Sequence, residues 1–165
     1  MKKIFLALAV ITSVSCSDKP NKDRFSDAAL TEKLTNSSGE QIAFGDIIKK
    51  HAGKPLVIEV WASWCGDCVK SMPAFKKLQS DNPDAAYAFI SMDKTEDKWK
   101  EGIEKHQLVG DHYWTPDGMK GSFGKSIDLD WIPRYIVIDK SGNVALYRAI
   151  ETDFEKIDTI LKTLK

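Results

Sequence analysis

The sequence predicts an α/β domain built on a central mixed β-sheet with helices on both faces. Two runs, 56–61 and 85–92, are apolar on both sides, which is typical of central parallel strands covered by helices. Residues with helical spacing lie between them, which predicts a right-handed strand–helix–strand crossover. Two later runs, 135–138 and 144–147, flank the turn-forming segment 139–143, so an antiparallel hairpin is predicted at one edge of the sheet.

Local signals place the elements in the first half of the chain. The segment 39–45 is predicted to form a short strand and turn, and Asp46 is expected to cap a helix that Gly53 ends. Helical spacing begins again at Asp67, after the first buried run. Pro73 is expected to kink that helix because it lacks a backbone N–H.

In the second half, residues 93–95 lead from the second buried run into another helix. Periodicity fades over 109–130, where Gly, Pro and Asp accumulate, and we expect a loop with one short helix at 121–125. Thr152 and Glu155 have capping-box spacing before an amphipathic stripe, which predicts a C-terminal helix.

Bulk properties exclude several classes of function. The chain has 165 residues, enough for one domain with its own core. Its 24 basic side chains balance its 24 acidic ones, so it lacks the positive field that nucleic-acid binding requires. It has no glycine-rich phosphate loop, and its three histidines lack metal-site spacing. We expect no nucleic-acid partner, no cofactor and no resident metal.

The N-terminus is typical of an export signal. Lys2 and Lys3 precede a short apolar run, and the following residues 13–16 resemble the lipobox of bacterial lipoproteins. That resemblance implies cleavage before Cys16 and lipidation of its thiol; the alternative is an ordinary cleaved signal in which Cys16 is incidental. We therefore expect a lipoprotein-type signal at 1–16, a polar tether at 17–35 and the folded domain at 36–165.

A Cys-x-x-Cys pair, Cys65 and Cys68, directly follows the first buried strand. Two thiols at this spacing, at a strand-to-helix junction, can form and break a disulfide. A zinc site would need two further ligands, and the chain offers only a few soft candidates: Cys16, His51, His106 and His112. Redox chemistry is the leading interpretation, and a purely structural bridge is the other alternative.

The segment 57–68, with Pro73 behind it, resembles the active-site segment of thioredoxins. The chain is most similar to the extracytoplasmic, membrane-tethered TlpA/ResA-type branch, from about Asp46 to its end. Trp131-Ile132-Pro133 is similar to the cis-proline loop of that family. The resemblance implies a thioredoxin fold. Asp67 departs from the family pattern, which commonly has proline there, and we expect it to tune the redox potential.

The expected roles of the cysteines follow from their positions. At the amino end of a helix, unpaired backbone N–H groups and the helix dipole favour a thiolate at Cys65, so Cys65 is the predicted nucleophile. Cys68 would resolve the mixed disulfide by attacking Cys65. Gly66 is expected to permit a tight turn and the close approach of a substrate backbone.

Glu59 is the other candidate catalytic residue. A carboxylate in an apolar strand costs several kcal/mol if it is ionised without partners. The resemblance implies a buried acid that moves a proton to and from the resolving thiol; the alternative is a glutamate that reaches water past a neighbour. X-Pro bonds are mostly trans, but the resemblance implies a cis bond before Pro133. Such a bond would expose the Ile132 backbone to a substrate peptide, with Trp64 and Trp131 as apolar rims.

These observations predict an exported, lipid-anchored, monomeric thiol-disulfide oxidoreductase that faces the periplasm or the cell exterior. It would reduce protein disulfides and draw electrons from a membrane donor, as the resembling branch does for instance during haem attachment to c-type cytochromes. One alternative is a redox-inert binding protein of thioredoxin fold. The other is a peroxiredoxin-like peroxidase, although the Pro and Thr context of such enzymes is missing before Cys65.

Overall fold

The computed structural model describes residues 23–165, so the signal segment and Cys16 lie outside the described residues. In this part of the chain, strands form one mixed sheet with the order β2-β1-β5-β4-β3-β6-β7. The strands are β1 (Lys33–Asn36), β2 (Gln41–Ala43), β3 (Leu56–Trp61), β4 (Ala86–Ser91), β5 (Asp111–Trp114), β6 (Arg134–Ile138) and β7 (Val144–Ala149). The helices are α1 (Asp27–Thr31), α2 (Phe44–Lys50), α3 (Gly66–Asp81), α4 (Glu96–His106), α5 (Ser122–Ser126) and α6 (Phe154–Thr163).

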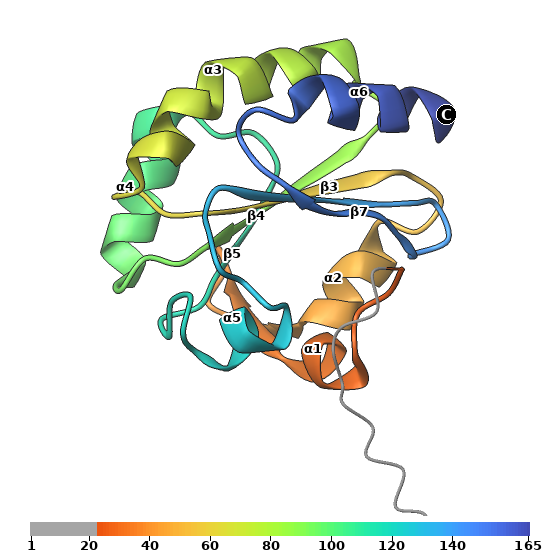
Figure 1. The fold of residues 1–165 in the computed structure, drawn as a ribbon. Helices are drawn as coiled ribbons and strands as arrows, with labels where there is room; N and C mark the ends of the chain where they lie inside the picture. The colour runs from red at the N-terminus through yellow and green to blue at the C-terminus, as the bar shows by residue number, and fades with distance from the viewer. Residues whose placement is uncertain (1–22) are drawn as a thin grey trace, which may run out of the picture.

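The centre of the sheet confirms the predicted α/β class. All six residues of β3 are buried, and β3 pairs in parallel with β4 and antiparallel with β6. Helices α3, α4 and α6 cover one face of the sheet, and α1, α2 and α5 cover the other (Figure 1). Because both faces are covered, apolar side chains can point both ways along β3, which explains its continuous hydrophobic run.

The hairpin β6–β7 forms as predicted, with Gly142 at a φ of +87° in its turn. Gly53, at a φ of +88°, follows α2, so the predicted helix end is also confirmed. Helix α3 runs from Gly66 to Asp81 with Pro73 inside it. No helix between residues 23 and 165 has the length and apolar character needed to cross a membrane.

One strand was missed in the segment expected to be a loop. Residues 111–114 form β5, which pairs in parallel with β4 and antiparallel with β1. Only Tyr113 in this strand is buried. A four-residue strand with one buried side chain has no clear period in the sequence, and its pairing partners are distant in the chain.

The folded domain begins earlier than predicted. Part of the segment expected to be a polar tether forms α1 and β1, and Phe25, Ala29 and Leu34 are buried in it. The Phe25 ring packs edge-on against Phe44, with ring centroids 4.7 Å apart, and lies 5.7 Å from Tyr147. The partners of Phe25 lie on elements distant in the sequence, so the polar composition of its own segment did not predict these contacts.

Two predicted helix caps are wrong. Helix α2 already begins at Phe44, so Asp46 lies in its first turn, where the carboxylate pairs with Lys49 at an exposed site. Helix α6 begins after Asp153, whose carboxylate accepts a hydrogen bond from the backbone N–H of Ile150 and does not cap the helix. The predicted capping residue Thr152 lies one position outside this start.

The burial of Leu34 in β1 predicts that this strand is needed for stability. Leu34 is fully buried, and its neighbour Lys33 is exposed. Leu34→Ala should lower the free energy of unfolding by about 2–5 kcal/mol, because it leaves a cavity in the core. Lys33→Ala is the matched control and should change it by less than about 0.5 kcal/mol. Urea unfolding measures both, and equal effects would contradict the assignment of β1 to the core.

Candidate active site

The two cysteines lie at the junction between β3 and α3 and form a disulfide. Cys65 is the N-cap of α3, and its Sγ accepts a hydrogen bond from the backbone N–H of Cys68 at 3.1 Å. The S–S distance is 2.05 Å. Cys65 is 6% exposed and Cys68 is fully buried, so a partner can reach only the first sulfur from solvent. The helix amino end beside Cys65 favours a thiolate there when the bond is reduced.

A buried carboxylate that the sequence did not reveal holds the loop before Cys65. Asp93, two residues after β4, accepts hydrogen bonds from the backbone N–H of Ser63 at 3.0 Å and from its hydroxyl at 2.7 Å. The Ser91 hydroxyl also donates to this carboxylate, at 2.8 Å. These hydrogen bonds satisfy the buried carboxylate, and they hold Ser63 in place two residues before Cys65. An acidic residue directly after a buried strand was the only available signal.

The cis-proline loop meets the disulfide from the other side. The bond between Ile132 and Pro133 is cis, as the resemblance implied, and the carbonyl oxygen of Ile132 lies 3.6 Å from the Sγ of Cys65. A disulfide sulfur carries no hydrogen, so this contact becomes a hydrogen bond only when Cys65 is a thiol. The structure therefore brings together the three sequence-predicted residues Cys65, Ile132 and Pro133.

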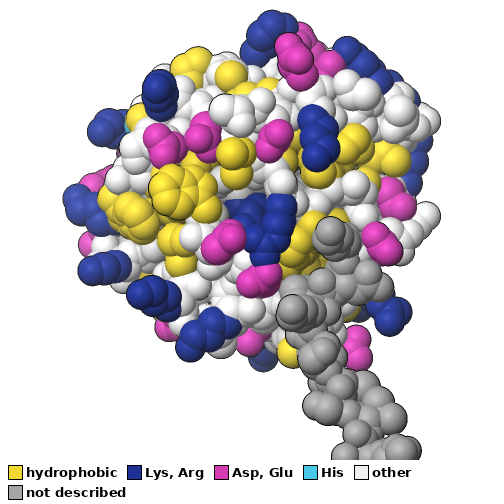
Figure 2. Space-filling view, in the orientation of Figure 1, with side chains coloured by type: hydrophobic (Ala, Val, Ile, Leu, Met, Phe, Trp, Pro, Cys, Tyr) yellow, Lys and Arg dark blue, Asp and Glu magenta, His cyan; other side chains and the backbone are white. Residues whose placement is uncertain are grey.

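Apolar side chains border the disulfide. Trp64 is 60% exposed and Trp131 is 54% exposed, which is unusual for such large rings. Figure 2 shows hydrophobic side chains gathered on one face of the molecule. Gly66 is exposed, its backbone is not in the left-handed region, and a Cβ there would meet nothing within 4 Å. The turn at Cys65 therefore does not require glycine at position 66. The close approach of a substrate backbone stays the prediction for the role of Gly66.

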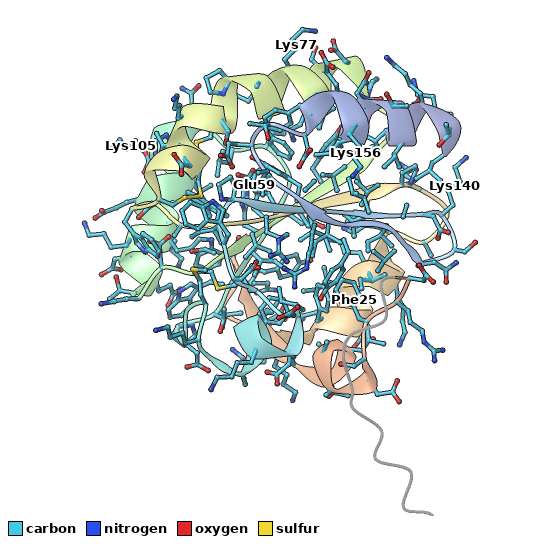
Figure 3. The ribbon with its side chains drawn as sticks, viewed as in Figure 1. Phe25, Glu59, Lys77, Lys105, Lys140 and Lys156 are labelled. Carbon is cyan, nitrogen blue, oxygen red and sulfur yellow. A yellow bond between two sulfur atoms is a disulfide. The ribbon has the colours of Figure 1, made fainter. Side chains whose placement is uncertain are left out.

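Glu59 lies at the centre of the domain, beneath α3 and α6 (Figure 3). It is fully buried, and this corrects the alternative in which it reaches water. Its Oε1 accepts a hydrogen bond from the hydroxyl of Tyr135 at 3.3 Å, and Oε2 has no hydrogen-bond partner among residues 23–165. Burial raises the pKa of Glu59 to about 8, while the bond from Tyr135 lowers it in part.

Two hydroxyl groups connect Glu59 to the turn that carries Cys68. The hydroxyl of Tyr135 lies 3.1 Å from Oγ of Ser71, and Ser71 donates to the backbone carbonyl of Cys68 at 2.9 Å. Sequence reasoning missed both residues. Tyr135 stands directly opposite Glu59 in the pairing of β3 with β6, which only the strand register reveals.

The remaining predicted residue, Asp67, lies in the first turn of α3 and is exposed. None of the ion pairs formed by residues 23–165 includes Asp67 or Lys70. The described part of the chain also contains no group of three His, Cys, Asp or Glu side chains placed to hold a metal ion.

Comparisons with known proteins agree with this geometry. A Chlorobium tepidum protein described as a thiol:disulfide interchange protein DsbE has a similar structure, with a TM-score of 0.70 and 19% identity, covering 88% of this chain and 98% of that one. A Bacteroides vulgatus protein described as a thiol-disulfide oxidoreductase is 26% identical, with a TM-score of 0.65, covering 81% and 91%. The fold is thus that of thioredoxin-like thiol-disulfide oxidoreductases, and it carries a Cys65–Cys68 pair.

Sequence comparison defines the family. The model of the Redoxin family matches residues 22–161, so the chain belongs to that family. The thioredoxin-like protein YneN of Bacillus subtilis is 32% identical over 80 residues, which are 46% of this chain and 45% of YneN. Thioredoxin-1 of Caenorhabditis elegans is 28% identical over 57 residues, 34% of this chain and 50% of that protein. The matches therefore span about half the length of these two relatives.

The exposed charge of Asp67 predicts an effect on the redox potential. Asp67→Asn should raise the reduction potential by a few tens of millivolts, because a carboxylate in the first turn opposes the Cys65 thiolate. Such charge effects are worth about 1 kcal/mol, and about 1.4 kcal/mol corresponds to roughly 30 mV. Equilibrium titration against glutathione measures the potential. Asp81→Asn, at the far end of α3, is the control; an unchanged or more negative potential in Asp67→Asn would contradict the prediction.

Proposed function

We propose that this protein is a thiol-disulfide oxidoreductase that passes two electrons from Cys65 and Cys68 to disulfides of other proteins. The observation that carries the proposal is the position of the disulfide. Cys65 is the N-cap of α3, and its Sγ lies 3.6 Å from the carbonyl oxygen of Ile132. Beside that carbonyl, an extended substrate peptide could pair with the Ile132 backbone, and Trp64 and Trp131 supply apolar contacts.

The reaction would proceed in two exchange steps. The Cys65 thiolate attacks one sulfur of the substrate disulfide, so a mixed disulfide forms and the other substrate sulfur leaves as a thiolate. The Cys68 thiol then loses its proton and attacks the Sγ of Cys65. The first substrate sulfur leaves as a thiolate, and the Cys65–Cys68 disulfide forms. The substrate has gained two electrons that the two cysteines have lost, and its two thiolates take their protons from solvent.

Glu59 is the proposed acceptor of the Cys68 proton. Cys68 is fully buried, so water cannot take the proton directly. A carboxylate with a pKa of about 8 is well matched to this task near neutral pH, because it can both accept and release a proton. Glu59 has no competing cation, since no Lys, Arg or His of residues 23–165 pairs with it.

We further propose that the protein acts outside the cytoplasm as a reductase, anchored through a lipid on Cys16 and supplied by a membrane electron donor. One structural neighbour is described as a secreted disulfide oxidoreductase of Mycobacterium tuberculosis, which supports export. Cysteines that receive haem in c-type cytochromes are one proposed class of substrate. As a monomer, the protein would leave the Trp64 and Trp131 rims free for such partners.

Insulin reduction in the presence of dithiothreitol tests the activity. Cys65→Ser should abolish it, because a serine hydroxyl cannot replace a thiolate as nucleophile. In a separate experiment, Cys68→Ala should accumulate a mixed disulfide between Cys65 and a partner protein. Identification of the protein trapped from the source cells would name the substrate. Activity near wild type in Cys65→Ser would refute the mechanism, and peroxide consumption dependent on Cys65 would favour the peroxidase alternative.

The anchor predicts a defined N-terminus. The mature protein should begin at a lipidated Cys16 and partition with membranes, because an acyl chain supplies apolar surface that the domain lacks. In Cys16→Ser the protein should remain soluble or unprocessed. Peptide mass mapping and membrane fractionation measure both outcomes. An unmodified N-terminus beyond residue 16 in the native protein would leave only an ordinary export signal.

A further inference from the structure

Three hydrogen-bond contacts in series join Glu59 to the backbone of the resolving cysteine. They connect the carboxyl of Glu59 to the hydroxyl of Tyr135, that hydroxyl to Oγ of Ser71, and Oγ to the carbonyl oxygen of Cys68. The distances are 3.3, 3.1 and 2.9 Å. Ser71 is 7% exposed and the other three residues are fully buried or nearly so, which leaves these groups few other partners.

The number of protons limits how these contacts can be made. A carbonyl oxygen only accepts, so Ser71 must use its single hydroxyl proton to bond Cys68. Its contact with Tyr135 then needs the tyrosine proton, and the contact of Tyr135 with Glu59 needs a proton on Glu59. All three hydrogen bonds therefore form together only when Glu59 is protonated. When Glu59 is ionised, Tyr135 donates to the carboxylate, and one of the two contacts of Ser71 loses its proton.

We propose that Tyr135 and Ser71 are positioning residues that couple the protonation of Glu59 to the hydrogen bond on the Cys68 carbonyl. When Glu59 is protonated, each group in this series of hydrogen bonds donates toward Cys68. When Glu59 is ionised, the Tyr135 hydroxyl donates in the opposite direction, toward Glu59. The turn of α3 that carries the resolving cysteine thus responds to whether the buried acid holds a proton. The link to catalysis, but not the coupling itself, depends on the proposed role of Glu59 as proton acceptor.

The surroundings of the chain support this coupling. Burial and the charge of Glu59 raise the pKa of Tyr135, so the tyrosine stays protonated and acts as a donor. Its ring is held by Phe75 of α3 and Phe154 of α6, each with centroids 5.2 Å away. The charge of Glu151, just before α6, also raises the pKa of Tyr135.

The two hydroxyl groups should shift the pKa of Glu59 in opposite directions. Tyr135→Phe removes the donor to the ionised carboxylate, so the pKa should rise, by about one unit if that bond has ordinary strength. Ser71→Ala removes the acceptor that Tyr135 needs when Glu59 is protonated, so the pKa should fall. A structural role for either side chain does not predict opposite signs.

Infrared difference spectroscopy of the full chain in its disulfide form measures the protonated carboxyl band against pH, and Glu59→Gln assigns the band. In this form neither Cys65 nor Cys68 titrates, so the result is independent of catalysis. Tyr87→Phe is the matched control: Tyr87 is buried against the same Phe75, but its hydroxyl bonds Asn82. Ser71→Thr keeps the hydroxyl and should restore the wild-type pKa.

Carbonyl NMR tests the other end of this series of hydrogen bonds, at the carbonyl group of Cys68. With 13C-carbonyl-labelled Cys68, the carbonyl shift should titrate with Glu59 in the wild type and lose that titration in Ser71→Ala. Shifts of equal sign in Tyr135→Phe and Ser71→Ala, or shifts below about 0.3 units in both, would overturn the coupling. The pH profile of insulin reduction is a separate measurement. If the pKa shifts appear and that profile does not follow them, the coupling stands and the proposed catalytic role of Glu59 fails.

Discussion

The antiparallel register between β3 and β6 is the constraint on which the whole site depends. It places Val60 opposite Arg134 and Glu59 opposite Tyr135. The residues that follow β3 lead to Cys65, and those that precede β6 include Ile132 and Pro133, so one pairing brings both chain segments to the same edge of the sheet. A slip of one residue would turn every side chain to the opposite face and separate the acid from its tyrosine.

The same register divides polar groups between the two faces of the central strands. Tyr135 points toward α3 and α6, and its neighbour Arg134 points to the other face, where it pairs with Asp130. Arg134 is 2% exposed, so its charge needs that carboxylate. Burying such groups costs stability, and the pairing with Asp130 and the hydroxyl chain from Glu59 limit the cost. The molecule therefore holds polar side chains in fixed geometry on both faces of its central strands.

Rigidity and exposure are distributed unevenly around the cysteines. Asp93 fixes the strand-to-helix loop through Ser63, and the cis-proline loop closes over Cys65 to within 3.6 Å. Outside this frame, more than half of the surface of Trp64 and of Trp131 is exposed to solvent. Exposed aromatic rings beside a sulfur in a fixed frame offer apolar contacts that depend little on the sequence of a partner.

The sequence alone determined the α/β class, the central strands, the terminal hairpin and the position of the two cysteines, because each of these has a local signature in period or spacing. Glu59 stood out for the same reason, as a charge within an apolar run. Only the tertiary structure decided the rest: β5, the packing of Phe25 and Leu34 from the expected tether, and the hydrogen bonds of Tyr135, Ser71 and Asp93. These features depend on strand register and on contacts between residues far apart in the chain. A side chain whose partner lies on another element gives no local sign of it, and tyrosine, serine and aspartate are ordinary residues until the fold sets what stands opposite them.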